Sequence, residues 1–182
     1  MSGYSPSNST IAWPIPALLQ HVPGLLLAAV PLAALQPLFT HIAMHMARTH
    51  PLLFSRLGPH TGKHFLIDPI DLPFVLVLRP DAAHPSLRVF RRTANPPHDA
   101  VIASTFINLL DMIDGRLDGD ALFFSRELRV AGDTEAVVAL RNALDDFEGS
   151  ALDGVIAALG PLSKPAALAV AALHRLTSRN TP

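Results

Sequence analysis

Two histidines, His41 and His45, are the first residues whose type and spacing could do chemistry, because they lie four apart in the stretch HIAMH. On a helix this spacing puts both imidazoles on one face, where they could share a metal ion. The zinc-hydrolase motif has a glutamate beside its first histidine, and here Ile42 occupies that position. A third ligand would have to come from His50 or from a distant site. We therefore favour a polar or membrane-facing stripe and expect no metal.

Carboxylates are the second candidate for chemistry. The cluster that imitates a calcium-binding loop consists of Asp111, Asp114, Asp118 and Asp120. A calcium loop closes with a glutamate at its twelfth position, but here that position is Leu122 or Ser125. Asp145 and Asp146 form a pair, yet adjacent helix positions point in different directions. We therefore expect the cluster to end a helix and the pair to lie on a solvated face.

Phosphate-binding and nucleophilic motifs are incomplete. Gly58, Gly62 and Lys63 resemble part of a phosphate-binding loop, but the full spacing and the following Ser or Thr are absent. No serine-centred elbow appears, and the chain has no cysteine, which excludes thiolate nucleophiles and thiolate metal ligands. We therefore expect a protein that is not an enzyme and carries no cofactor.

Charge patterning points away from nucleic acid. The 182 residues carry a net charge of -1, so no global basic field is present. The densest basic region is formed by Lys63, Arg79, Arg88, Arg91 and Arg92. It could hold phospholipid headgroups or an acidic partner, or it could be an ordinary strand surface.

The start of the chain is apolar and carries no Lys, Arg, Asp or Glu before Arg48. Residues 22–39 are about as long as a membrane-spanning helix, but Pro23, Pro31 and Pro37 interrupt them. We expect broken helices that lie on a bilayer or cover another apolar surface. The residues predicted to contact the membrane are Leu25, Leu26, Leu27, Leu32, Leu35, Leu38 and Phe39.

The elements that would position a site follow from local patterns. We predict a flexible tail over residues 1–10, apolar helices over 11–50, one domain over 51–148 and further helices over 149–182. Within the domain, HFLIDPI, PFVLVLRP, LRVFRR, DAVIAS and LRVAGD are typical of strands, and their short spacers favour antiparallel neighbours. Ser104 and Asp133 are candidate helix caps, and Gly115 would end the first helix. The fold class is α+β, an antiparallel sheet of about five strands with helices packed on it.

A longer stretch resembles a known family. The order of four strands, an amphipathic helix and then DALFFSRELRVAGDTE (120–135) resembles the sterol carrier protein type 2 (SCP-2) lipid-binding domain family, and most of all its UbiT-like bacterial branch. DPIDLPF (68–74), DAVIAS (99–104) and NALDD (142–146) also match, so the resemblance covers residues 52–147. Arg129 departs from the pattern, since an aliphatic residue is common at that position.

The resemblance implies a domain folded around an apolar tunnel for a lipid, either a prenylated ubiquinone precursor, ubiquinone or phospholipid. It implies an accessory role in oxygen-independent ubiquinone biosynthesis, beside partner enzymes that include iron–sulfur hydroxylases. The protein would be cytoplasmic and peripherally associated with the inner membrane.

The candidate tunnel is apolar throughout. We predict that its lining consists of Val75, Val77, Ile102, Phe106, Leu110, Phe123, Phe124, Leu128, Val130, Leu140 and Leu144. The same residues could instead fill an ordinary solid core. The alternative function is then a membrane-associated interaction or scaffold module without a ligand tunnel.

Overall fold

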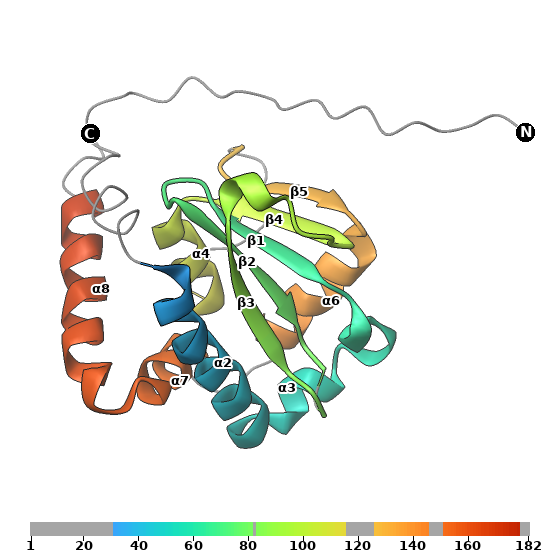
Figure 1. Cartoon of the computed structure of the whole chain (residues 1–182), viewed down its shortest axis with the longest axis horizontal. Helices are drawn as coiled ribbons and strands as arrows, with labels where there is room; N and C mark the ends of the chain where they lie inside the picture. The colour runs from blue at the N-terminus through green and yellow to red at the C-terminus, as the bar shows by residue number, and fades with distance from the viewer. Residues whose placement is uncertain (1–30, 82, 116–125, 146–150, 179–182) are drawn as a thin grey trace, which may run out of the picture.

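A computed structural model describes residues 31–81, 83–115, 126–145 and 151–178 of the chain (Figure 1). Its centre is a five-stranded sheet with the order β3-β2-β1-β4-β5. The strands are β1 (Phe65–Pro69), β2 (Phe74–Arg79), β3 (Ser86–Arg91), β4 (Ala100–Ser104) and β5 (Arg129–Gly132). All five predicted strands are confirmed.

The sheet is mixed, which corrects the expectation of a purely antiparallel arrangement. Three pairs are antiparallel, but β1 and β4 run parallel, with Phe65 opposite Ala100 and Ile67 opposite Ile102. The rule for short spacers holds for β1-β2-β3, which follow one another along the chain and pair in that order. It fails for β4 because this strand pairs with β1, three strands earlier, rather than with β3.

The crossover between β3 and β4, residues 92–99, is what makes the parallel pair possible. It begins with the 3-10 helix η2 (Arg92–Ala94) and buries Pro96. The Arg92 guanidinium fastens its start by pairing with Asp68 and by donating to the backbone oxygens of Pro69 and Leu72, both at 2.7 Å. One side chain thus holds the crossover to the end of β1.

Helices pack against the sheet and beside it. The chain forms α2 (Leu32–Thr49), α3 (Pro51–Ser55), the 3-10 helix η1 (Gly58–Gly62), α4 (Phe106–Ile113) and α6 (Thr134–Asp145). It ends with α7 (Ala151–Ala158), the 3-10 helix η3 (Gly160–Leu162) and α8 (Ser163–Ser178). Figure 1 shows α4 and α6 on one face of the sheet, α2 along its β3 side and α8 at the margin. None of the helices in the described ranges is long and apolar enough to cross a bilayer.

Helix α2 corrects a second expectation, because it continues through Pro37. A proline removes one hydrogen bond and crowds the preceding turn. Here Leu35 and Phe39 on either side of it pack against the sheet, and this burial offsets the loss. Pro31, by contrast, stands at the N-cap, where a missing N–H costs nothing.

The ends of α4 and α6 are set by side-chain caps. Thr105, rather than the predicted Ser104, caps α4 by accepting a hydrogen bond from the Asn108 N–H at 3.3 Å. Ser104 is buried and donates to the Glu127 oxygen at 2.7 Å, which ties β4 to the approach to β5. Asp133 caps α6 as predicted, accepting from the Ala136 N–H at 3.0 Å. Gly115, with φ of +67°, follows the end of α4.

Candidate functional site

The register of the sheet decides which side chains can face the helices. Residues directly opposite each other on paired strands lie on the same face, so Phe65 shares its face with Leu78 and Ala100. The alternation along β2 then places Phe74, Leu76 and Leu78 on that face and Val75 and Val77 on the other. Only the first face is covered by α4 and α6.

The first apolar cluster lies between the sheet and α6. Its buried members are Leu57, Phe65, Ala100, Ile102, Leu109, Leu128, Ala136, Leu140 and Ala143. Five of the predicted lining residues come together here, because Ile102, Leu128 and Leu140 are buried in this cluster and Val130 and Leu144 pack against it half-buried.

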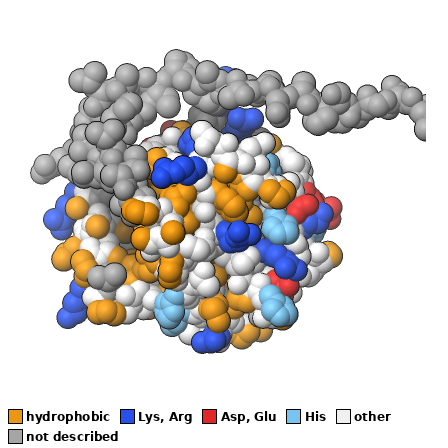
Figure 2. Space-filling model, in the orientation of Figure 1, with side chains coloured by type: hydrophobic (Ala, Val, Ile, Leu, Met, Phe, Trp, Pro, Cys, Tyr) orange, Lys and Arg blue, Asp and Glu red, His pale blue; other side chains and the backbone are white. Residues whose placement is uncertain are grey.

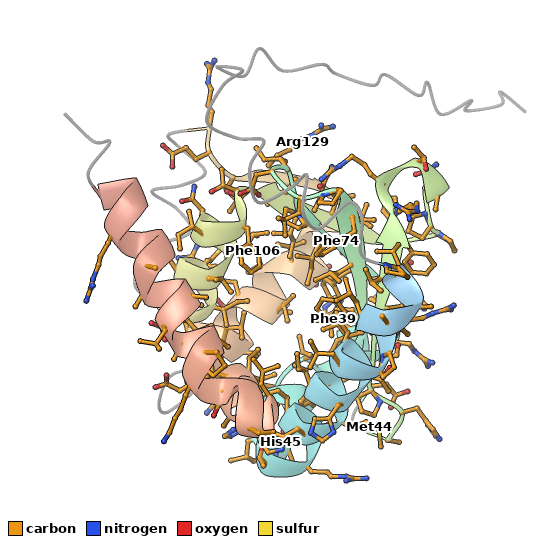
Figure 3. The ribbon with its side chains drawn as sticks, turned by 60° about the vertical axis from the view of Figure 1, so that its left-hand side comes forward. Phe39, Met44, His45, Phe74, Phe106 and Arg129 are labelled. Carbon is orange, nitrogen blue, oxygen red and sulfur yellow. The ribbon has the colours of Figure 1, made fainter. Side chains whose placement is uncertain are left out.

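A second apolar cluster lies where α2 and α4 approach the β2-β3 side of the sheet. Its buried members, Leu72, Phe74 and Val89, are surrounded by Leu32, Leu35, Phe39, Leu76 and Phe106, all half-buried. The Phe39 and Phe74 rings meet edge to face with centroids 6.3 Å apart. Figure 3 shows Phe39, Phe74 and Phe106 directed toward the same region between the sheet and the helices. This cluster therefore keeps an apolar wall that its own side chains do not fully cover.

Sequence reasoning missed Phe74 and assigned Phe39 to a membrane. The run PFVLVL is apolar at every position, so its pattern does not tell which alternate residues face the helices. Leu87 and Val89 in β3 give the missing signal, because they alternate with Arg88 and lie opposite Leu78 and Leu76.

The predicted membrane-contact residues of α2 turn toward the domain. Leu32 and Leu35 pack on the second cluster, and Phe39 packs on it as well. Leu38 packs against a third cluster that α2 shares with α3 and α7, whose buried members are Ile42, Met46, Leu53, Phe54 and Ala158. Leu25, Leu26 and Leu27 lie outside the described residues. The described part of this segment therefore covers the domain's own apolar surface, which was the alternative expectation.

Other predicted lining residues are not brought to the two clusters. Val75 and Val77, 3% and 4% exposed, point to the face of the sheet opposite α4 and α6. Leu110 is half-buried on α4 and belongs to none of the three clusters of described residues. Phe123 and Phe124 lie outside the described residues.

The sequence AGD, residues 131–133 in the stretch that resembles the SCP-2 family, has a clear structural reason. Gly132 has φ of +77°, and a Cβ there would lie 2.3 Å from the Asp99 backbone oxygen. That oxygen accepts a hydrogen bond from the Asp133 N–H at 2.9 Å. A glycine is needed because the chain leaving β5 passes directly over the start of β4.

Two aspartates beside this glycine are held ionised. The pKa of the Asp99 carboxyl is lowered chiefly because the carboxylate accepts a hydrogen bond from the His64 N–H at 2.7 Å, and the Lys63 charge adds to the effect. The pKa of Asp133 is lowered chiefly by the hydrogen bond from the Ala136 N–H and then by Lys63, whose Nζ is 3.2 Å from the carboxylate. Lys63, the former phosphate-loop candidate, thus pairs with a helix cap.

The remaining charged candidates make structural contacts. His41 and His45 stack with ring centroids 6.3 Å apart, and no three His, Asp or Glu residues in the described ranges are placed to hold a metal. Arg79 pairs with Asp81 at 3.1 Å, and the Arg88 guanidinium lies 5.1 Å from the centre of the Phe90 ring. Figure 2 shows Lys and Arg side chains interspersed with hydrophobic ones on the face in view.

The described elements define a small α+β domain in which helices cover one face of a mixed sheet over an apolar interior. The model of the SCP-2 sterol transfer family matches residues 46–145, more than half of the chain, and the chain belongs to this family of lipid-binding domains. The match begins inside α2 and ends with α6, so it includes the first cluster and the buried members of the second, whereas Leu32, Leu35 and Phe39 of α2 lie before it.

Solved structures with a similar fold include three proteins of related description. A structure titled UbiJ-SCP2 ubiquinone synthesis protein has a TM-score of 0.45 and 22% identity, covering 63% of this chain and 88% of its own. Sterol carrier protein 2 from Yarrowia lipolytica has 0.43 and 11%, covering 58% and 86%. A sterol carrier protein domain of Helicoverpa armigera has 0.41 and 15%, covering 59% and 86%. No curated protein matches the chain.

Proposed function

We propose that this protein is a lipid-binding accessory factor of oxygen-independent ubiquinone biosynthesis that holds a prenylated quinone precursor for partner enzymes. The observation that carries the lipid-binding part is the half-buried apolar wall around Phe39, Phe74 and Phe106. The quinone part is supported by the UbiT-like stretch around Gly132, whose backbone contact explains its AGD step.

The physical basis is the burial of an insoluble tail. Each square ångström of apolar area removed from water stabilises the complex by about 25 cal/mol. A prenyl chain lying along the second cluster would contact Leu76 of β2, Phe106 of α4 and Leu35 of α2. The polar ring would remain accessible to hydroxylases with iron–sulfur clusters and to methyltransferases. Such a factor would act in the cytoplasm at the surface of the inner membrane.

Lipid extraction tests the proposal directly. The full chain is purified without detergent, extracted with organic solvent, and the extract is identified by mass spectrometry. We expect a prenylated quinone or quinone precursor in stoichiometric yield. Phospholipid alone would contradict the quinone part, and a protein that neither retains nor takes up a prenylated or acylated molecule would contradict the whole.

A pair of phenylalanine variants locates the site. Phe106 and Phe90 are both half-buried, but Phe106 faces the second cluster and Phe90 lies on the opposite face of the sheet, under Arg88. Phe106→Ala should weaken uptake of a fluorescent prenyl probe by about ten-fold or more, because an apolar contact worth about 1.5–3 kcal/mol is lost. Phe90→Ala should leave uptake unchanged. Equal effects in the two variants would show that the ligand does not lie on the α4 side.

A further inference from the structure

Helix α8 (Ser163–Ser178) is apolar and yet mostly exposed. It packs mainly against α7 and η3, its neighbours along the chain, and stands at the margin of the molecule (Figure 1). Among the α8 side chains that the structure describes, Ser163, Ala166 and Val170 are half-buried. Leu168, on the other side, is 71% exposed. Because α8 also has little tertiary packing, its exposed side is a candidate surface for a partner outside the domain.

The exposed side of α8 has a definite pattern. Five of its exposed residues follow one another at helical spacing, namely Lys164, Leu168, Ala171, Ala172 and Arg175, and Pro165, Ala167 and Ala169 are exposed beside them. The two cations stand at the ends, about 16 Å apart at 1.5 Å per residue, and the apolar residues lie between them. Figure 2 shows hydrophobic side chains along the left-hand margin, where Figure 1 places α8. We call these five residues the α8 stripe.

The charge of this region is mainly positive. Residues 151–182 contain Lys164, Arg175 and Arg179 and a single acidic side chain, Asp153 on α7. A second copy docking through the same stripe would bring cations against cations. An anionic lipid surface offers the complement, since it attracts the cations and accepts the apolar residues between them.

We propose that the α8 stripe is a docking surface for an anionic phospholipid bilayer. The helix lies in the plane of the interface, with Leu168, Ala171 and Ala172 toward the acyl chains. Lys164 extends its charged end to the headgroup phosphates, as long basic side chains do at such interfaces. This goes beyond the proposed function, because the stripe lies outside both clusters on the sheet and takes the membrane rather than the carried molecule as its partner.

The contacts of α7 give the docking a consequence for the domain. Helix α7 packs against α8 on one side and against α2 on the other, where Ala158 lies in the cluster of Ile42 and Met46. A bilayer held by α8 is thus one helix away from α2, which covers the Phe74 cluster.

Vesicle flotation of the full chain tests the docking surface. The probes are phosphatidylcholine vesicles with and without phosphatidylglycerol, and the readout is the part of binding that depends on phosphatidylglycerol. Leu168→Glu is compared with Leu52→Glu on α3, a matched control because Leu52 is 73% exposed. We expect Leu168→Glu to weaken anionic binding by about ten-fold or more and Leu52→Glu to leave it within about two-fold.

A charge pair completes the design. Lys164→Glu should weaken anionic binding by about ten-fold, whereas Arg129→Glu, the same change of net charge at an exposed position of β5, should weaken it by at most about two-fold. Equal effects of the two reversals, or of the two leucine variants, would overturn the proposal. Binding that is the same with and without phosphatidylglycerol would overturn it too.

Gel filtration with light scattering on the same variants separates a second copy from a membrane. If Leu168→Glu abolishes self-association and leaves flotation unchanged, the stripe is a contact between copies and the proposal fails. The retained lipid is measured on the same preparations. Loss of flotation with unchanged lipid content supports docking through α8 whatever that lipid is, whereas a chain that binds no carried lipid but floats through α8 contradicts the proposed function alone.

Discussion

Helices α2 and α8 are both apolar, yet they are used in opposite ways. Helix α2 turns Leu35 and Phe39 onto the Phe74 cluster and Ile42 and Met46 onto a cluster with α3 and α7. Helix α8 leaves Leu168 to solvent and packs chiefly on its chain neighbours. Hydropathy alone thus does not tell whether an apolar helix completes a core or serves as a surface.

A polar residue makes the difference at α2. The Gln36 amide donates to the Leu87 oxygen and its oxygen accepts from the Val89 N–H, both at 3.0 Å. These are groups of β3, the edge strand of the sheet, and unpaired edge groups invite pairing with other chains. The Gln36 side-chain amide therefore satisfies two backbone groups of β3 as a neighbouring strand would. These two hydrogen bonds fix the position of α2 along the sheet.

The largest expected difference between α2 and α8 is in the stability lost when one apolar side chain of each helix is truncated. Ile42→Ala removes a buried side chain from the α2 cluster and should lower the free energy of unfolding by about 2–5 kcal/mol. Leu168→Ala removes an exposed side chain and should change it by less than about 0.5 kcal/mol. Urea denaturation followed by circular dichroism measures both. Similar losses would mean that α8 is part of the core.

The next effect concerns the edge of the sheet. Gln36→Ala leaves the Leu87 oxygen and the Val89 N–H without their partner in a part-buried position, and should cost about 1–2 kcal/mol. Gln36→Glu keeps the acceptor for Val89 but faces the Leu87 oxygen with a second oxygen, so it should be destabilising as well. Hydrogen exchange of the Val89 amide is the specific readout and should become faster in both variants. An unchanged Val89 amide would show that α2 is held by apolar packing alone.

The sequence predicted elements better than their mutual faces. The strands were recognised because Pro, Asp and Asn bound each apolar run, and Asp133 was recognised because a cap acts on the residues next to it. The parallel pairing of β1 with β4 was not predicted because it depends on a crossover that Arg92 fastens to Pro69 and Leu72, at least 20 residues earlier in the sequence. The faces of Val75 and Val77 and the orientation of α2 escaped for a related reason. The elements that pack against a strand or helix decide which of its faces is buried. A run that is apolar at every position does not show which residues meet those elements.

The smallest expected difference is electrostatic: the stability of the domain should depend on pH through Asp99, whereas α8 should not contribute to this dependence. The folded pKa of Asp99 is below its ordinary value of about 3.9, chiefly because of the His64 N–H, so its contribution to stability is complete above that value. It is lost as the pH falls through the folded pKa. Helix α8 contains no Asp or Glu, so no acidic side chain of that helix contributes to this slope. Urea midpoints of Asp99→Asn should therefore fall less steeply below about pH 4 than those of the unaltered chain. Parallel slopes would mean that the hydrogen bond from His64 does not favour the ionised form, and that the β1-β4 junction owes its order to packing around Gly132.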